Sequence, residues 1–166
     1  MLSKARRISE KFHMVIHVAL SVIVIYLYGL SGINFGFQEI IILIIMSVLP
    51  DMEHLVFFST YGRKNPYTIQ ALEIFKREGF LSVCRFLAGN HKTLTSLYFH
   101  NIVTPLFFTF VSVYSFYLGA FLLSAAGAVL ASHYLFDVCE DILMSGKLNP
   151  NWFFKFNKPS NYKGRK

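Results

Sequence analysis

All six histidines of this 166-residue chain, and five of its nine acidic residues, lie beside long apolar stretches. They form four groups along the sequence: His13 and His17; Asp51, Glu53 and His54; His91 and His100; and His133, Asp137, Glu140 and Asp141. Imidazole nitrogens and carboxylate oxygens together suit zinc, manganese or iron, whereas calcium and magnesium prefer oxygen ligands. The residue types therefore indicate a site for a divalent transition metal.

Spacing supports this interpretation most directly in the last group. His133 and Asp137 are four residues apart, so on a helix both project from one face, and Asp141 continues that face one turn later. A structural hydrogen bond between His133 and Asp137 across one turn is the alternative. Glu140 points away from this face and is expected to be a solvated charge. His13 is equally compatible with a surface histidine and with a metal ligand.

The elements that must position these groups are apolar stretches at about residues 13–30, 35–49, 101–117 and 118–136. Each has roughly 15 to 20 residues, near the length that crosses a hydrocarbon core of about 30 Å. The chain is 54% hydrophobic, with mean hydropathy +0.47, and 15% charged, whereas soluble domains carry about 25% charged residues. We therefore expect an all-α, polytopic membrane protein with four transmembrane helices.

The basic residues predict its orientation. All sixteen Lys and Arg residues lie before the first stretch, between the second and third, or after the fourth. The positive-inside rule then places both termini, the middle segment and the four polar groups on the cytoplasmic side. It also explains the net charge of +7 without nucleic acid, because basic flanks face anionic lipid headgroups. Ionisable groups so near hydrocarbon must be paired or bind metal.

The chain divides into a membrane domain over residues 1–144 and a basic, aromatic tail over residues 145–166. Within the membrane domain, residues 60–90 alternate apolar and charged residues at helical spacing. This pattern predicts two short amphipathic helices, hinged near Gly79, that lie on the membrane surface or form a lid over the site. The tail carries Trp152 and several phenylalanines, and is expected to be an interfacial anchor.

Four motifs, in order, resemble the membrane-bound metal-dependent hydrolase family, the YdjM-like inner-membrane proteins. They are a histidine in the first stretch, LPDMEH after the second, GNHKTLTS before the third and SHYLFDVCEDILMSG at the end of the fourth. The resemblance implies metal ligands at His17, Asp51, His54, His91, His133 and Asp137. Glu53 stands where the family has Asp, Lys92 where it has Arg, and Ser96 where it has a second His. His100, four residues beyond Ser96, can substitute because both share a helix face.

The expected function is a metal-dependent hydrolase at the cytoplasmic membrane face, with the six implied ligands and His100 holding one or two ions, zinc first and manganese or iron as alternatives. Such an ion lowers the pKa of bound water to about 7 and polarises a phosphoryl or carbonyl oxygen. Glu53 or Asp141 would be the general base. Lys92 and Arg85 would steady an anionic substrate, such as a lipid or lipid-linked phosphoester.

Two other functions stay open. A divalent metal transporter would use the same residues as a transit site. The outer halves of the apolar stretches, however, offer only Ser, Thr and Tyr as relays, so a transport path would need a homo-oligomer. A non-catalytic membrane module would use the metal only to hold helices together, and ligand substitution would then unfold it.

Overall fold

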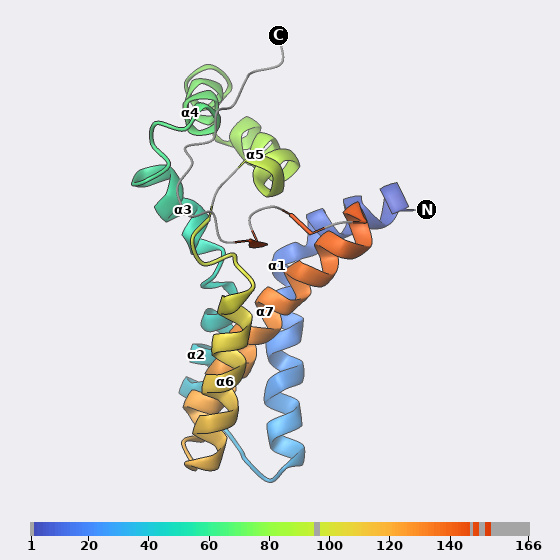
Figure 1. Ribbon diagram of the computed structural model, residues 1–166, viewed down its shortest axis with the longest axis vertical. Helices are drawn as coiled ribbons and strands as arrows, with labels where there is room; N and C mark the ends of the chain where they lie inside the picture. The colour runs from blue at the N-terminus through green and yellow to red at the C-terminus, as the bar shows by residue number, and fades with distance from the viewer. Residues whose placement is uncertain (1, 95–96, 147, 150–151, 154–166) are drawn as a thin grey trace.

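The computed structural model describes residues 2–94, 97–146, 148–149 and 152–153; of residues 2–11, 88–94 and 144–145 only the backbone is described. These ranges form seven α-helices and no strand, which confirms the predicted all-α fold (Figure 1). The helices are α1 (Leu2–Leu30), α2 (Phe37–Val48), α3 (Met52–Ser59), α4 (Pro66–Glu78), α5 (Phe80–Leu94), α6 (Val103–Tyr117) and α7 (Phe121–Ser145).

Among the described residues, two helices are long and apolar enough to cross a membrane, over Phe12–Leu30 of α1 and Phe121–Leu143 of α7. A third crossing is obtained if α2 and α3, which are bent by 52° at the break between them, count as one span. The break contains Pro50, which has no N–H to continue the hydrogen-bond ladder of α2. Two or three spans are consistent with an integral membrane protein. The fourth predicted span, α6, has only 15 residues and is too short on the same measure.

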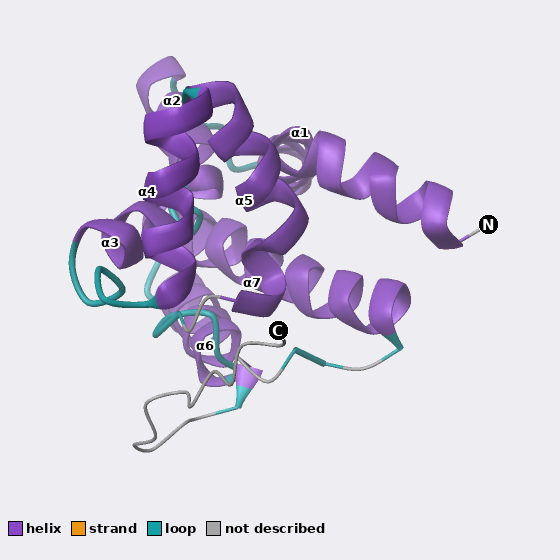
Figure 2. Cartoon of the chain, turned by 90° about the horizontal axis from the view of Figure 1, so that it is seen from above, coloured by secondary structure: helices purple, strands orange, loops and turns teal. Residues whose placement is uncertain are grey.

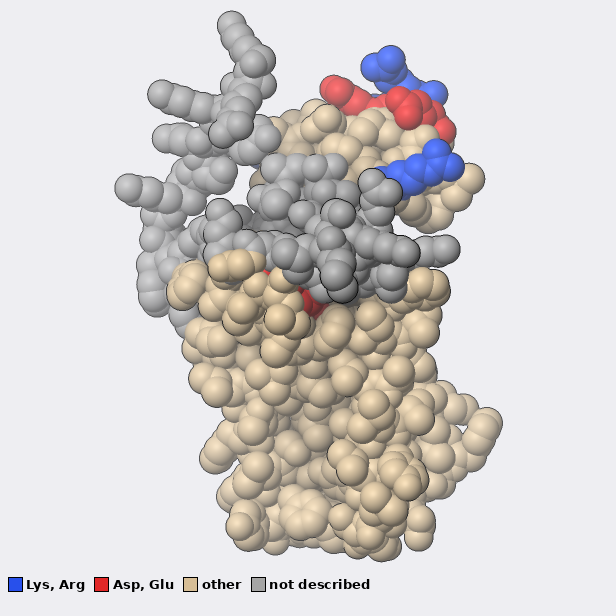
Figure 3. Space-filling model, turned by 90° about the vertical axis from the view of Figure 1, so that its right-hand side faces the viewer, with Lys and Arg blue, Asp and Glu red and all other residues tan. Residues whose placement is uncertain are grey.

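The helices α1, α2, α6 and α7 run along the long axis, and α4 and α5 lie beyond one end of them (Figure 1). At that end the first turns of α1 and the last turns of α7 extend side by side (Figures 1 and 2). The core between the long helices is apolar and centres on Leu43, Ala125 and Val129. On the face shown in Figure 3, the charged side chains of the described residues gather toward the end that carries α4, and the far end has none.

Two glycine turns separate neighbouring helices, and the first lies at the hinge predicted near Gly79. Gly79, with φ +83°, separates α4 from α5, and Gly119, with φ +72°, lies in the turn between α6 and α7. A positive φ is strained for residues with a Cβ, so glycine is favoured at both turns. The residues Ile69, Leu72 and Phe75 of α4 are exposed, as expected for the apolar face of an amphipathic helix.

The α6–α7 hairpin closes most tightly at Gly127 of α7. A Cβ at Gly127 would lie 2.9 Å from the backbone nitrogen of Ser112 and 3.0 Å from the carbonyl oxygen of Phe108. Both are backbone atoms of α6, which cannot rotate aside as a side chain would. Small residues at helix contacts allow such close approach in membrane bundles.

Substituting Gly127 by alanine is therefore expected to destabilise the fold by about 1–3 kcal/mol, because α6 must shift away from α7. Gly29→Ala is the matched control, since Gly29 lies in α1 and its Cβ would meet nothing within 4 Å. Thermal unfolding in detergent, followed by circular dichroism, should show a lower midpoint for Gly127→Ala alone. Equal midpoints for the two variants would contradict the close approach.

Candidate metal centre

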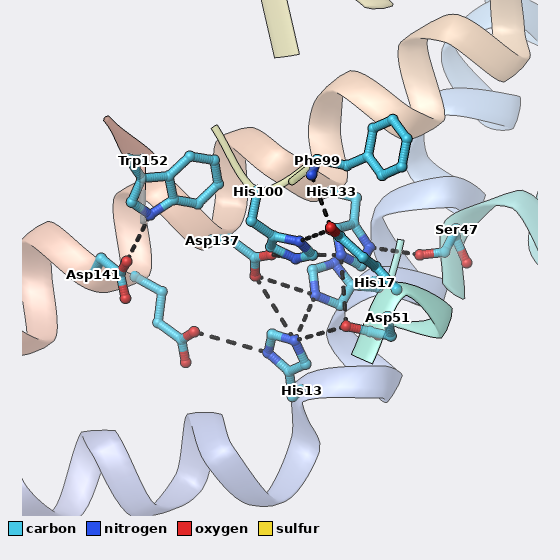
Figure 4. A network of polar contacts seen from close by, with 12 residues as sticks. His13, His17, Ser47, Asp51, Phe99, His100, His133, Asp137, Asp141 and Trp152 are labelled. Carbon is cyan, nitrogen blue, oxygen red and sulfur yellow. Dashed lines mark hydrogen bonds and ion pairs between the residues drawn. The ribbon is translucent and has the colours of Figure 1, made fainter. Parts of the chain in front are cut away.

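The polar groups meet where α1, the break between α2 and α3, and α7 come together, beside the segment that leads into α6 (Figure 4). Two histidines there are almost completely buried: His17 and His133 are each 1% exposed. Asp137 is also buried and lies among them. Such burial of ionisable groups requires strong partners, which neighbouring donors or a bound cation can supply.

Donor atoms from α1, α7 and the helix break lie close to Nε2 of His13. The Nε2 atoms of His13 and His17 are 3.1 Å apart. Asp137 Oδ1 is 3.5 Å from Nε2 of His17 and 3.7 Å from that of His13, and Asp51 Oδ1 is 3.6 Å from His13 Nε2. Ligands of a tetrahedral ion with bonds of about 2.0–2.1 Å are themselves about 3.3 Å apart. The spacing therefore fits donors arranged around an ion.

His133 is held in the tautomer that a metal ligand needs. Its Nδ1 is 2.6 Å from the carbonyl oxygen of Ser47, which can only accept, so Nδ1–H is the donor. This carbonyl is available because α2 ends at Val48 and leaves its last carbonyls without helical partners. The His133 Nε2 lone pair then faces Oδ2 of Asp137 at 3.4 Å. Ligating histidines commonly donate their second N–H in this way.

His100 is held similarly, by the carboxylate of Glu53. Its Nδ1 lies 2.8 Å from Glu53 Oε2, and its Nε2 lies 3.6 Å from Asp137 Oδ2. The other oxygen of Glu53 accepts from the backbone N–H groups of Tyr98 and Phe99 and from the Tyr61 hydroxyl. Both oxygens are thus occupied, which favours a positioning role for Glu53 over the expected role of general base. Burial and the charge of Glu53 raise the pKa of Tyr61, so its phenol stays protonated and donates.

Two residues that the sequence did not place in the ligand set belong to this cluster. His13 contacts carboxylates from two elements, and Glu140, expected to be solvated, is only 4% exposed. Its Oε2 lies 3.8 Å from His13 Nδ1, so the expectation for Glu140 is wrong. The reason is that α1 packs along α7 here and covers that side of the helix. The sequence signal that could have identified His13 as a ligand is its i, i+4 spacing to His17, the same spacing as that of His133 and Asp137.

Asp141 and His54 lie at the edge of the cluster. Asp141 is buried and accepts a hydrogen bond of 2.7 Å from Nε1 of Trp152. Trp152 is only 3% exposed, and its carbonyl oxygen accepts from the N–H of Ile102. It therefore packs inside the protein, contrary to the interfacial anchor expected from the tail. The ring of His54 lies beside that of His100, with centroids 5.6 Å apart.

The remaining expected site residues come from α5. Arg85 is exposed on this helix. His91 and Lys92 belong to α5, but their side chains lie outside the described residues. Contacts between these two side chains and the cluster therefore stay predictions from the sequence.

Several buried polar atoms of the cluster have no hydrogen-bond partner among the described residues, notably Nε2 of His133, Oδ1 of Asp137 and Oδ2 of Asp51. An unsatisfied buried polar atom costs about 1–3 kcal/mol. The first two are also the atoms that face other donors of the cluster at 3.4–3.8 Å. Divalent cations bound among these donors would satisfy both atoms, so the donor set fits metal binding.

Comparisons with protein-family models, curated proteins and solved structures each return no match. The family resemblance of the four motifs therefore rests on their residues and order. What the cluster can do chemically follows from its own geometry: histidine lone pairs with fixed tautomers and carboxylate oxygens converge in a buried site at one end of the helices.

Proposed function

We propose that this protein is a membrane-embedded, metal-dependent hydrolase. The observation that carries the proposal is the convergence of histidine Nε2 atoms on Asp137, with His133 and His100 oriented through their Nδ1 atoms. A divalent ion bound there would lower the pKa of a bound water to about 7 and polarise a phosphoryl or carbonyl oxygen. Ser47 and Glu53 would keep the two imidazoles in the ligating tautomer, and the apolar surroundings would restrict access of bulk water.

The packing below the cluster favours a hydrolase over a transporter. Leu43, Ala125 and Val129 fill the space between the helices, and each is at most 1% exposed. Beside them, the hydroxyls of Tyr28 and Ser124 hydrogen-bond to each other and present no carboxylate or imidazole to a cation. A transported divalent ion would have to pass this apolar layer without ligands. A site with this apolar layer on one side suits catalysis on a substrate that arrives from the opposite end of the helices.

We place the site at the cytoplasmic membrane face, with four membrane crossings and both termini in the cytoplasm. The distribution of Lys and Arg supports this orientation. The proposed fourth crossing is α6, the shorter partner of α7 in a hairpin. The proposed substrate is a lipid or lipid-linked phosphoester. The exposed apolar residues of α4, together with the nearby exposed Lys76, Arg77 and Arg85, would hold α4 and α5 against anionic headgroups.

The function is tested with the full chain, purified in detergent and loaded with zinc or manganese. We expect hydrolysis of a phosphoester, assayed by phosphate or alcohol release. His133→Ala should lower the rate at least 100-fold, because loss of a metal ligand should reduce activity at least as much as loss of a residue that orients one. Cys139→Ser, an exposed position of the same helix, is the control and should keep the wild-type rate.

The outcomes separate the three functions. A folded, metal-free and inactive His133→Ala supports the hydrolase. A variant that fails to fold, as judged by size-exclusion chromatography and circular dichroism, indicates a structural metal. A metal-loaded wild-type protein that hydrolyses no ester, but moves the metal into proteoliposomes, would contradict the hydrolase proposal and favour a transporter.

A further inference from the structure

The rings of His17 and His133 stack face to face. Their centroids are 3.5 Å apart, and the angle between their planes is 16°. An imidazole holds a metal close to its own ring plane, along the nitrogen lone pair, at about 2.0–2.1 Å. At the distance where such an ion would lie, a tilt of 16° brings the two ring planes less than about 1 Å closer than they are at the ring centres. A single ion would therefore lie well outside at least one ring plane, so the two lone pairs suit two separate positions.

Asp137 divides the histidines in the same way. Its Oδ1 faces His17 and His13, at 3.5 and 3.7 Å from their Nε2 atoms. Its Oδ2 faces His133 and His100, at 3.4 and 3.6 Å. Each carboxylate oxygen thus serves one histidine pair, and the stacked rings belong to different pairs. This is the arrangement of a carboxylate that bridges two cations.

We propose that the site holds two divalent metal ions bridged by Asp137. His13, His17 and Oδ1 of Asp137 bind the first, and His100, His133 and Oδ2 bind the second. Oδ1 of Asp51 lies 3.6 Å from His13 Nε2 and 3.8 Å from His133 Nε2, between the two positions, and can complete either set. The ring spacing of 3.5 Å matches the separation of about 3.5–4 Å seen in two-metal hydrolytic sites.

The inference rests on the proposed metal-dependent function and narrows its substrate class. Two ions at this separation clamp both the attacking and the leaving oxygen of an in-line displacement at phosphorus. A phosphoester is therefore favoured over a carboxylic ester. The bond that breaks is P–O, water supplies the new P–O bond, and the leaving oxygen takes up a proton.

The test is the number of ions per chain and their magnetic coupling. The full chain in detergent is loaded with Mn²⁺, freed of excess metal and measured by inductively coupled plasma mass spectrometry and electron paramagnetic resonance. We expect two ions per chain and the spectrum of an exchange-coupled pair. His100→Ala should keep the first ion, bind the second at least 10-fold more weakly and show the spectrum of isolated Mn²⁺. Cys139→Ser should match the wild type.

The number of bound ions and their coupling distinguish a bridged pair from a single-metal site and from a protein without metal. Two coupled ions in the wild type support the bridged pair. One ion per chain, or two ions without coupling, would overturn the pair while the metal site and the hydrolase proposal stand. No bound ion in a folded wild-type protein would overturn the metal site itself. The wild-type result decides these cases even if His100→Ala does not fold.

Discussion

Replacing Asp137 by asparagine should leave the purified protein without bound metal and abolish its hydrolytic activity. Asp137 is the one residue whose oxygens lie within 3.4–3.7 Å of four histidine Nε2 atoms of the described cluster. Asparagine has nearly the same shape, but it is neutral and turns an N–H₂ group toward one of the two histidine pairs. Metal affinity should fall more than about 100-fold, because removing even an orienting partner costs 10–100-fold.

Thermal unfolding with and without added metal measures this effect directly. A ligand at 100 times its dissociation constant stabilises the folded state by about 2.7 kcal/mol, so the wild-type midpoint should rise on addition of zinc and the Asp137→Asn midpoint should not. Asp141→Asn is the matched control: it makes the same change one turn further along α7, where the carboxylate holds Trp152. Zinc should still stabilise that variant. A zinc-dependent rise in Asp137→Asn equal to that of wild type would refute the central role of Asp137.

Replacing Glu53 by glutamine should leave the fold in place but weaken metal binding by about 10–100-fold, because His100 loses its orientation. The glutamine oxygen can still accept from the backbone of the segment before α6. Its N–H₂ group would then face Nδ1 of His100, which lies 2.8 Å from Oε2 of Glu53. Two donors cannot share a hydrogen bond, so the imidazole proton is expected to move to Nε2, the atom that faces Asp137.

This prediction has a spectroscopic readout that a purely structural role of Glu53 would not move. Long-range ¹H–¹⁵N correlation spectra of ¹⁵N-histidine protein report which ring nitrogen of His100 carries the proton. We expect Nδ1–H in the metal-free wild type and Nε2–H in Glu53→Gln. Glu53→Ala is the contrasting variant, and because it leaves several buried donors unpaired it should cost about 3–5 kcal/mol of stability. An unchanged tautomer in a folded Glu53→Gln would contradict the assigned role.

Much of the secondary structure was predictable because local signals determine it. Apolar runs mark the long helices, Pro50 marks the break after α2, and Gly79 and Gly119 mark the turns that need a positive φ. The choice of His and Asp as candidate ligands stays a prediction, drawn from residue chemistry and from the i, i+4 rule, which are properties of a single helix. Burial of His17, His133 and Asp137 agrees with this reasoning.

Most helices, the donor types and their gathering at one end were predictable from local sequence, but not which helix faces meet. That depends on how α1 lies along α7 and on the 52° bend between α2 and α3, which follow from packing between distant segments. Tertiary structure therefore decided that His13 and Glu140 face the cluster, that Glu53 orients His100, and that Trp152 is buried against Asp141. A periodic pattern specifies which residues share a face of one helix, whereas a metal site depends on how several helices are placed relative to one another.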